Sequence, residues 1–266
     1  MKKIDLLFIL LLIGCQEAAS LKEESLLIIA HRGASGYAPE STLASFRLAN
    51  KMNADYLEFD VQMTKDGELV VFHDAKVDRT TNAKGELKQY TLKQLKELDA
   101  GSWFNEKYQG EKVLTVREVF EAFGNRTNYF IEIKNPPNDS KIEEKLIALL
   151  KEYNLLKKKG QVILHSASKP SLLKMQSLAP ETELGILYWN RDEVEIAQAE
   201  LNEIKDCVSH VVVNQHVLTK ADIQKVKEAG FSVHVYTVND VEMAEKLKTW
   251  GADGIITDFP DLLHFF

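Results

Sequence analysis

The stretch Leu26–Thr42 reads LLIIAHRGASGYAPEST, and the stretch Tyr56–Asp74 reads YLEFDVQMTKDGELVVFHD. Each starts as a short apolar run, which is typical of a buried β-strand, and changes to polar residues where that run ends. Glu58 and Asp60 are two residues apart on the second run, so their side chains point to the same face of the strand. His31 stands where the first run ends. These features predict carboxylates and imidazole gathered at one end of a sheet.

The rest of the chain repeats this alternation of a short strand and a helix. The expected strands are Leu26–Ala30, Tyr56–Val61, Tyr129–Ile133, Val162–His165, Leu184–Tyr188, Val211–Asn214, Val233–Val238 and Gly254–Thr257. The expected helices are Thr42–Met52, Val116–Phe123, Lys141–Tyr153, Pro170–Leu178, Asp192–Glu200, Ala221–Ala229 and Val241–Trp250. Eight such units in about 250 residues predict a (β/α)8 TIM barrel, with its active site at the carboxyl ends of the strands. A doubly wound sheet is the alternative, but the first turn lacks the G-x-G-x-x-G sequence of that fold.

Several helices carry recognisable end signals. Ser41 precedes the first helix and Asn239 precedes the last, and both are favoured N-cap residues. Thr115 is followed three residues later by Glu118, which is the spacing of a capping box. Gly251 stands where a C-terminal glycine stops a helix.

The polar residues at the strand ends occur in four short motifs, in chain order. They are His31-Arg32-Gly33, Pro39-Glu40-Ser41-Thr42, Glu58-x-Asp60 and His73-Asp74. In this order they resemble the glycerophosphodiester phosphodiesterase family. The resemblance continues through Asp78-Arg79-Thr80-Thr81, Glu132-Ile133-Lys134, Thr237-Val238-Asn239 and the closing stretch Asp253–Pro260. It implies hydrolysis of a glycerophosphodiester to glycerol 3-phosphate and an alcohol.

Three carboxylates, those of Glu58, Asp60 and Glu132, form a candidate metal site. An oxygen-only set is hard and favours Ca²⁺ or Mg²⁺ over zinc. The resemblance implies that these three residues are the metal ligands. Salt bridges at the barrel rim are the other interpretation of Glu58 and Asp60.

His31 and His73 are the candidate acid–base pair. Phosphodiester cleavage needs a base to activate an oxygen nucleophile and an acid to protonate the leaving alkoxide. An imidazole titrates near pH ~6.5, so it serves either role around neutrality. His165 ends an expected strand and is a candidate pocket residue. The remaining histidines are interpreted as structural: His210, His216, His234 and His264.

Other polar residues are candidates for substrate binding. Arg32 and Lys134 are expected to contact phosphate oxygens, as the resemblance implies. Glu40 either orients a catalytic group or a glycerol hydroxyl, or simply supplies negative charge at the N-terminus of the first helix. Tyr236 stands where the family commonly has Trp, and Ser41 where it commonly has Asn. We therefore expect Tyr236 to affect the wall that meets the alcohol group.

An insertion follows the hairpin of the second strand and spans Ala75 to Glu111, with a short helix near Leu92–Leu98. It carries Trp103, Phe104 and Tyr108. In the resembled family an insertion here covers the mouth of the barrel. A solvated loop with a small aromatic cluster is an equal alternative.

Three other functions are compatible with parts of this pattern. A phospholipase D acting on lysophospholipid or sphingolipid headgroups would use the same site and need an apolar groove, to which Trp103–Tyr108 are candidates to contribute. A non-catalytic surface binding module would not require the full set of histidines and carboxylates that is present. A glycosidase using Glu58 and Glu132 leaves His31 and Lys134 without a role.

Residues 1–20 are interpreted as an export leader and tether, and 21–266 as one glycerophosphodiester phosphodiesterase domain. The apolar run Leu6–Ile13 is too short to span a bilayer, which needs about 20 residues, and suits a secretory signal. It ends in Gly14 and Cys15, which resembles a bacterial lipoprotein processing site. We therefore expect an exported, membrane-anchored lipoprotein with an acylated Cys15. An ordinary signal peptide and a periplasmic or secreted protein is the alternative.

The composition of the chain limits the kinds of molecule that it is expected to bind. The chain has 33 Lys and Arg against 40 Asp and Glu, a net charge of −7, without a long block of like charge at either end. This argues against nucleic-acid binding. Cys207 is the only cysteine besides Cys15, so no disulfide framework is expected. No obligate protein partner is indicated, and the expected partner is a small glycerophosphodiester substrate.

Overall fold

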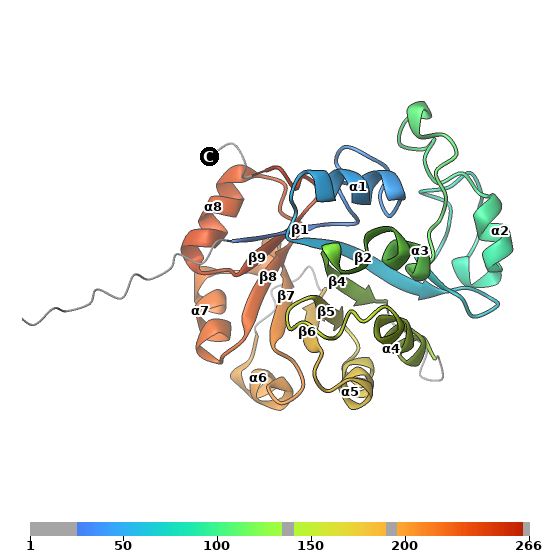
Figure 1. Cartoon of the computed structure of the whole chain (residues 1–266). Coiled ribbons are helices and arrows are strands. Elements are labelled where there is room, and N and C mark those ends of the chain that lie inside the picture. The colour runs from blue at the N-terminus through green and yellow to red at the C-terminus, as the bar shows by residue number, and fades with distance from the viewer. Residues whose placement is uncertain (1–25, 135–140, 190–195, 263–266) are drawn as a thin grey trace, which may run out of the picture.

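Eight parallel strands form a closed barrel in the computed structural model, which describes residues 26–134, 141–189 and 196–262 (Figure 1). The barrel strands are β1 Leu27–Ala30, β2 Tyr56–Met63, β4 Asn128–Ile133, β5 Val162–Ser166, β6 Glu183–Tyr188, β7 His210–Asn214, β8 Ser232–Tyr236 and β9 Gly254–Thr257. Strand β3 (Leu69–Val71) pairs antiparallel with β2 and extends the sheet outside the barrel. The predicted (β/α)8 fold and all eight predicted strands are confirmed.

Pairing of β1 with both β2 and β9 closes the barrel. Ile29 is opposite Tyr56 on one side and Ile256 on the other. Strands in such a sheet are buried on both faces, so each reads as a nearly continuous apolar run. Closure also places the residues that follow the first and last strands side by side.

Apart from α2, which lies in the insertion beside the barrel, the helices surround the barrel and cover its outer face (Figure 1). Their bounds are α1 Leu43–Lys51, α2 Leu92–Glu97, α3 Val116–Phe123, α4 Ile142–Glu152, α5 Lys169–Leu178, α6 Gln198–Ile204, α7 Lys220–Glu228 and α8 Val241–Trp250. Short 3-10 helices are η1 Leu87–Gln89, η2 Glu106–Tyr108, η3 Gly124–Arg126 and η4 Gln215–Val217. The helix predicted at Asp192–Glu200 falls partly on residues 190–195, outside the described part of the chain. Helix α6 begins at Gln198 and continues beyond the predicted end.

Helix ends agree with two predictions and correct two others. Thr115 and Glu118 form the predicted capping box at α3, and Gly251 ends α8 in the left-handed conformation. The N-cap of α1 is Thr42 rather than Ser41. Ser41 instead takes a left-handed conformation, with φ 58°, and its N–H donates to a turn carbonyl. The N-cap of α8 is Asp240, one residue after the predicted Asn239.

The core has two layers. Large rings fill the space between the barrel and its helices, where Phe59 contacts Tyr129 at 6.2 Å between ring centroids. A smaller group occupies the barrel interior and includes Ile29, Phe130 and Val212. Burial of this apolar area stabilises the strands whose ends carry the polar residues.

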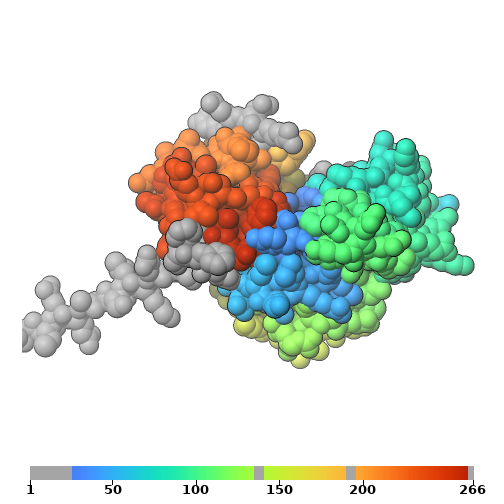
Figure 2. Space-filling model, turned by 90° about the horizontal axis from the view of Figure 1, so that it is seen from above, coloured from blue at the N-terminus to red at the C-terminus, as the bar shows by residue number. Residues whose placement is uncertain are grey.

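The insertion forms its own small core beside the barrel. Val77, Leu87 and Leu95 pack there against the β3 hairpin. Trp103 and Tyr108 both contact Phe104, at centroid distances of 5.7 and 5.8 Å. In Figure 2 the insertion is the teal and green lobe on the side opposite the orange and red C-terminal elements. The aromatic residues thus form a satellite cluster, as one of the two interpretations expected.

Candidate active site

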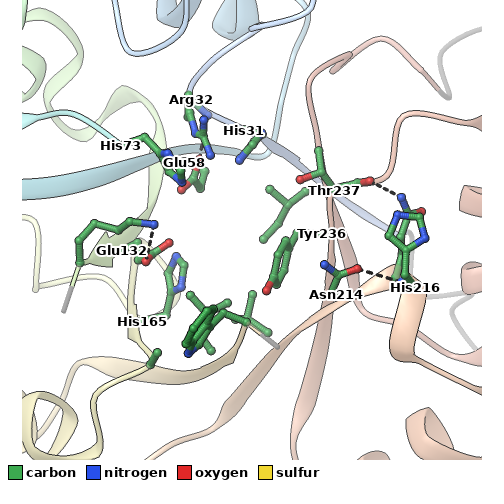
Figure 3. A pocket seen from close by; sticks show the side chains of 17 residues that line it. His31, Arg32, Glu58, His73, Glu132, His165, Asn214, His216, Tyr236 and Thr237 are labelled. Atoms are coloured by element: carbon green, nitrogen blue, oxygen red, sulfur yellow. Dashed lines mark hydrogen bonds and ion pairs between the residues drawn. The ribbon is translucent and has the colours of Figure 1, made fainter. Parts of the chain in front are cut away.

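The carboxyl ends of the barrel strands surround a cavity of about 840 Å³ (Figure 3). One side of it is charged and the other is largely apolar. The charged side is lined by His31, Arg32, Glu58, His73, Glu132, Lys134 and His165. The other side includes Leu187, Trp189, Val212, Tyr236 and Ile256. Among the described residues, none between Ala75 and Glu111 lines this cavity, so the insertion aromatics do not contribute the groove that a phospholipase D was expected to need.

Two histidines on the charged side are held in the same way. The Nδ1 atom of His31 lies 2.6 Å from an Asp258 oxygen, and that of His73 lies 2.6 Å from an Asp74 oxygen. An ionised carboxylate only accepts, so each Nδ1 carries the hydrogen. The other ring nitrogen, Nε2, is then the basic atom of each imidazole.

The charge states of these pairs follow from burial and from their partners. Burial lowers the pKa of His31 and of His73 below the usual histidine range. Burial alone would raise the pKa of Asp258, but the hydrogen bond and charge of His31, together with the hydrogen bonds from Asn239 and Ser35, outweigh it and lower this pKa to about 2. Burial is likewise outweighed at Asp74, where Arg79 and His73 lower the pKa to about 2. Neutral imidazoles beside ionised carboxylates result near pH 7.

Asp258 is fixed by a small network after the last strand. Its Oδ1 accepts from Ser35 Oγ at 2.8 Å, and its Oδ2 accepts from Asn239 Nδ2 at 2.6 Å. Asn239, expected to cap a helix, thus orients the partner of His31. Asp258 and Asp74 occurred in motifs of the sequence but had been given no role of their own.

The three candidate metal ligands come from adjacent strands. Glu58 and Asp60 lie on β2, and Glu132 lies beside Asp60 on β4. Glu58 accepts the backbone N–H of Arg32 at 2.8 Å. Burial, and next the charge of Asp60, raise the pKa of Glu58 well above its usual range, and the same two causes raise that of Glu132 to about 7. Glu58 and Glu132 therefore lie where ionisation of a carboxyl group is unfavourable.

Asp60 is almost fully buried and lies between two cations. Its carboxylate is 3.4 Å from Arg32 Nε and 3.4 Å from Lys134 Nζ, and Lys134 also contacts Glu132 at 3.0 Å. Burial alone would raise the pKa of Asp60, but the charges of Arg32 and Lys134 hold it below its usual range. Asp60 thus stays ionised.

Arg32 and Glu40 form a second contact at the edge of the cavity. Arg32 Nη1 donates to Glu40 Oε1 at 3.0 Å, and Arg32 also lines the cavity. Glu40 does not line the cavity. Tyr236 lines the apolar side, with its hydroxyl donating to the Tyr188 carbonyl at 2.8 Å.

The Glycerophosphoryl diester phosphodiesterase family model matches residues 31–262. The chain belongs to this family. A glycerophosphodiester phosphodiesterase of Bacillus subtilis (strain 168) is 43% identical over 255 residues, covering 92% of this chain and 87% of the relative. One from Caldanaerobacter subterraneus subsp. tengcongensis is 39% identical over 249 residues, covering 89% and 96%.

Solved structures agree with this assignment. A phosphodiesterase of Oleispira antarctica, in complex with the product sn-glycerol-3-phosphate, is 31% identical, with a TM-score of 0.77 and coverage of 90% and 95%. A glycerophosphodiester phosphodiesterase of Agrobacterium tumefaciens is 28% identical, with a TM-score of 0.77 and coverage of 91% and 100%. As a member of the glycerophosphoryl diester phosphodiesterase family, the chain is a phosphoric diester hydrolase.

The charged side of this phosphodiesterase fits a divalent cation. Donor atoms of Glu58, Glu132 and His165 lie within 4.8 Å of one another. His165 is 2% exposed, and neither ring nitrogen has a hydrogen-bond partner among the described residues. Burial lowers its pKa to about 3, so its imidazole is neutral and able to bind a cation. Carboxylates that repel one another, next to an imidazole without a hydrogen-bond partner, form a set of ligands that a divalent cation would bind.

The remaining histidines divide by location. His210 and His234 are buried, with 2.9 Å between Nδ1 of the first and Nε2 of the second. His216 lines the cavity on the side opposite His73 (Figure 3), a position that its place after an expected strand did not reveal. His264 lies outside the described residues.

Proposed function

We propose that the chain hydrolyses glycerophosphodiesters to glycerol 3-phosphate and an alcohol by acid–base catalysis with His31 and His73. The observation that carries this proposal is the pair of histidine–aspartate contacts, each 2.6 Å, on one cavity. The solved relative with bound sn-glycerol-3-phosphate supports the substrate class.

The reaction needs two proton transfers, and the two imidazoles are suited to them. One Nε2 would accept the proton of the attacking hydroxyl, and the other imidazole, after taking up a proton from solvent, would deliver it to the leaving alkoxide. Ionised Asp258 and Asp74 keep the rings oriented and favour the imidazolium when it forms. Arg32 and Lys134 would bind phosphate oxygens, and their position on the cavity wall supports this role.

Metal dependence is part of the proposal. Glu58, Asp60 and Glu132 would hold a Ca²⁺ or Mg²⁺ ion, with His165 as an adjacent nitrogen donor. Such an ion supplies positive charge to the phosphoryl oxygens in the transition state. The donor atoms of Glu58, Glu132 and His165, which lie within 4.8 Å of one another, and the unpartnered imidazole of His165 support a cation here. Asp60 is assigned as a ligand from its place beside Glu132 on the neighbouring strand.

We further propose that the glycerol 2-hydroxyl is the nucleophile, which is what the family resemblance implies. Its oxygen would bond to phosphorus, the bond from phosphorus to the alcohol oxygen would break, and water would later open the cyclic phosphate. An intramolecular hydroxyl has an entropic advantage, with effective molarities of roughly 10⁵–10⁸ M in favourable cases.

A substrate that lacks only this hydroxyl tests the nucleophile. The 2-deoxy analogue of glycerophosphocholine is expected to be cleaved at least roughly 10³-fold more slowly than the parent, because no tethered oxygen remains. Release of choline is measured for both compounds under the same conditions. A comparable kcat for the two would assign the attack to water instead.

A phospholipase D-type activity on lysophospholipid or sphingolipid headgroups is the second candidate. The apolar side of the cavity favours it, since Leu187, Trp189 and Val212 offer a surface for an acyl chain. Glycerophosphocholine, glycerophosphoethanolamine and lysophosphatidylcholine should be compared by kcat/KM, with released glycerol 3-phosphate or choline as the readout. A higher kcat/KM for lysophosphatidylcholine would favour the second candidate.

We also propose export and anchoring through an acylated Cys15, which lies outside the described residues. Within the described part of the chain, no helix is long and apolar enough to cross a membrane. Replacing Cys15 with alanine is expected to move the protein from the membrane fraction to the soluble fraction. Cys207→Ala is the matched control and should leave the protein in the membrane fraction. Mass spectrometry of the mature N-terminus decides, because a terminus without acyl mass contradicts the anchor.

A further inference from the structure

Arg79 belongs to the Asp78-Arg79-Thr80-Thr81 motif, and so far it has entered the site only through its effect on the pKa of Asp74. It lies in the insertion and does not line the cavity. Its guanidinium nevertheless makes four hydrogen bonds to two carboxylates. Nε and Nη2 donate to Asp74 at 2.7 and 3.0 Å, and Nη1 and Nη2 donate to Glu40 at 2.6 and 2.9 Å.

Each of these carboxylates has one further partner in the cavity. The Asp74 oxygen that accepts from Arg79 Nη2 also contacts His73 Nδ1 at 2.6 Å. The Glu40 oxygen that accepts from Arg79 Nη2 also accepts from Arg32 Nη1 at 3.0 Å. One guanidinium therefore joins two arms of the site that come from separate segments, the loop after β1 and the end of the β3 hairpin.

The geometry requires arginine specifically. A guanidinium presents its donors in a rigid planar fork, which matches two carboxylates at once, whereas a lysine ammonium is a point charge on a flexible stem. An exposed ion pair alone contributes little to stability. Here the Arg79 guanidinium holds the carboxylates of Asp74 and Glu40. Asp74 in turn contacts His73, and Glu40 contacts Arg32, and both of these partners line the cavity.

We propose that Arg79 is a positioning residue for both His73 and Arg32, which makes the insertion part of the catalytic machinery. The proposal rests on the proposed acid–base role of His73. Through Asp74, Arg79 sets the orientation of the His73 ring and so affects kcat. Through Glu40, it sets the direction of Arg32 and so affects substrate binding.

The alternative is a purely structural clamp between the insertion and the barrel. Arg117 provides the matched control, since its guanidinium binds both oxygens of Glu152 on the outer surface between α3 and α4, away from the cavity. Arg117→Lys removes a comparable fork at a site without catalytic neighbours. It should leave kcat and KM unchanged and report what such an ion pair contributes to Tm.

Arg79→Lys is expected to lower kcat roughly 10–100-fold, because a misplacement of about 1 Å at the reacting groups costs on that order. KM should rise as well, while Tm falls no more than in Arg117→Lys. In an Asp74→Asn background the kcat effect of Arg79→Lys should largely disappear, since Arg79 reaches His73 only through Asp74, and the KM effect should persist. Glu40→Gln should raise KM with a smaller change in kcat.

Two results would overturn this role for Arg79. One is an Arg79→Lys enzyme with wild-type kcat and KM. The other is an Arg79→Lys effect on kcat of the same size with and without Asp74→Asn, which is what a structural clamp produces. His73→Ala separates this inference from the proposed function, because wild-type kcat in that variant would overturn the acid–base proposal itself.

Discussion

Replacing His31 or His73 with alanine is expected to lower kcat by roughly 10²–10⁴-fold, the usual contribution of one general acid–base group. KM should change less, because Arg32 and Lys134 still line the cavity and remain able to bind phosphate. Steady-state kinetics with glycerophosphocholine, at saturating Ca²⁺ or Mg²⁺, measures both constants. Circular dichroism and Tm establish that each variant is folded.

The two aspartates supply graded controls for this result. Asp258→Asn and Asp74→Asn retain an oxygen that accepts the Nδ1 hydrogen but lose the charge that favours an imidazolium. Each should cost less than removal of its histidine, since an aspartate acts only through the ring that it orients. Wild-type kcat in His31→Ala and His73→Ala would contradict the acid–base assignment.

The barrel was predictable because strands buried on both faces read as nearly continuous apolar runs. Val211–Asn214 and Gly254–Thr257, for example, stand out between polar helical segments. Helix starts were less predictable. Ser41 and Thr42 are both good N-caps, and only the positive φ of Ser41 shows that it belongs to the preceding turn. Local sequence does not distinguish two adjacent capping residues.

In the site, too, contacts between residues close in sequence were easier to predict than contacts between distant residues. The His73–Asp74 contact joins adjacent residues, whereas His31 and Asp258 are separated by 227 positions. The second contact exists because closure of the barrel places β1 beside β9. The predicted barrel contained that signal, since the first and last strands of a closed sheet are always neighbours. Asp258 directly follows the last strand, so its contact with His31 could have been predicted from the closed barrel.

The sequence could not predict whether the aromatic side chains of the insertion point toward the cavity or toward one another. Aromatic residues in a polar loop pack either over a cavity or on one another, and the sequence favours neither arrangement. In this chain Trp103 donates its indole N–H to the Ala100 carbonyl at 2.9 Å, and Tyr108 donates its hydroxyl to the Tyr37 carbonyl at 3.0 Å. These bonds hold the rings in the satellite cluster and away from the substrate cavity.

Chelation is expected to abolish activity, and Ca²⁺ or Mg²⁺ should restore it better than Zn²⁺, because the proposed ligands are mainly carboxylate oxygens. Binding also has a readout independent of turnover. A ligand at 100 times its Kd stabilises the folded state by about 2.7 kcal/mol. For a domain of this size that corresponds to a rise in Tm of roughly 5–10 °C. Calorimetry on the chelated protein, before and after adding each ion, measures it.

Glu58→Gln is the sharpest variant for this site. It should weaken ion binding by at least roughly 10–100-fold, since even residues that only support a ligand contribute that much. In chelator its Tm should not fall below that of the wild type. The amide oxygen can still accept the Arg32 N–H, and the substitution removes an acid whose ionisation is made costly by burial and by Asp60.

His165→Ala identifies the ligand set. If the three carboxylates hold the ion, this variant should lose much less affinity than Glu58→Gln, because only the neighbouring nitrogen donor is removed. Equal losses would place the ion among Glu58, Glu132 and His165, whose donor atoms lie within 4.8 Å of one another. Full activity in excess chelator, with no metal retained by elemental analysis, would contradict both arrangements and leave the buried carboxylates as partners of Arg32 and Lys134 alone.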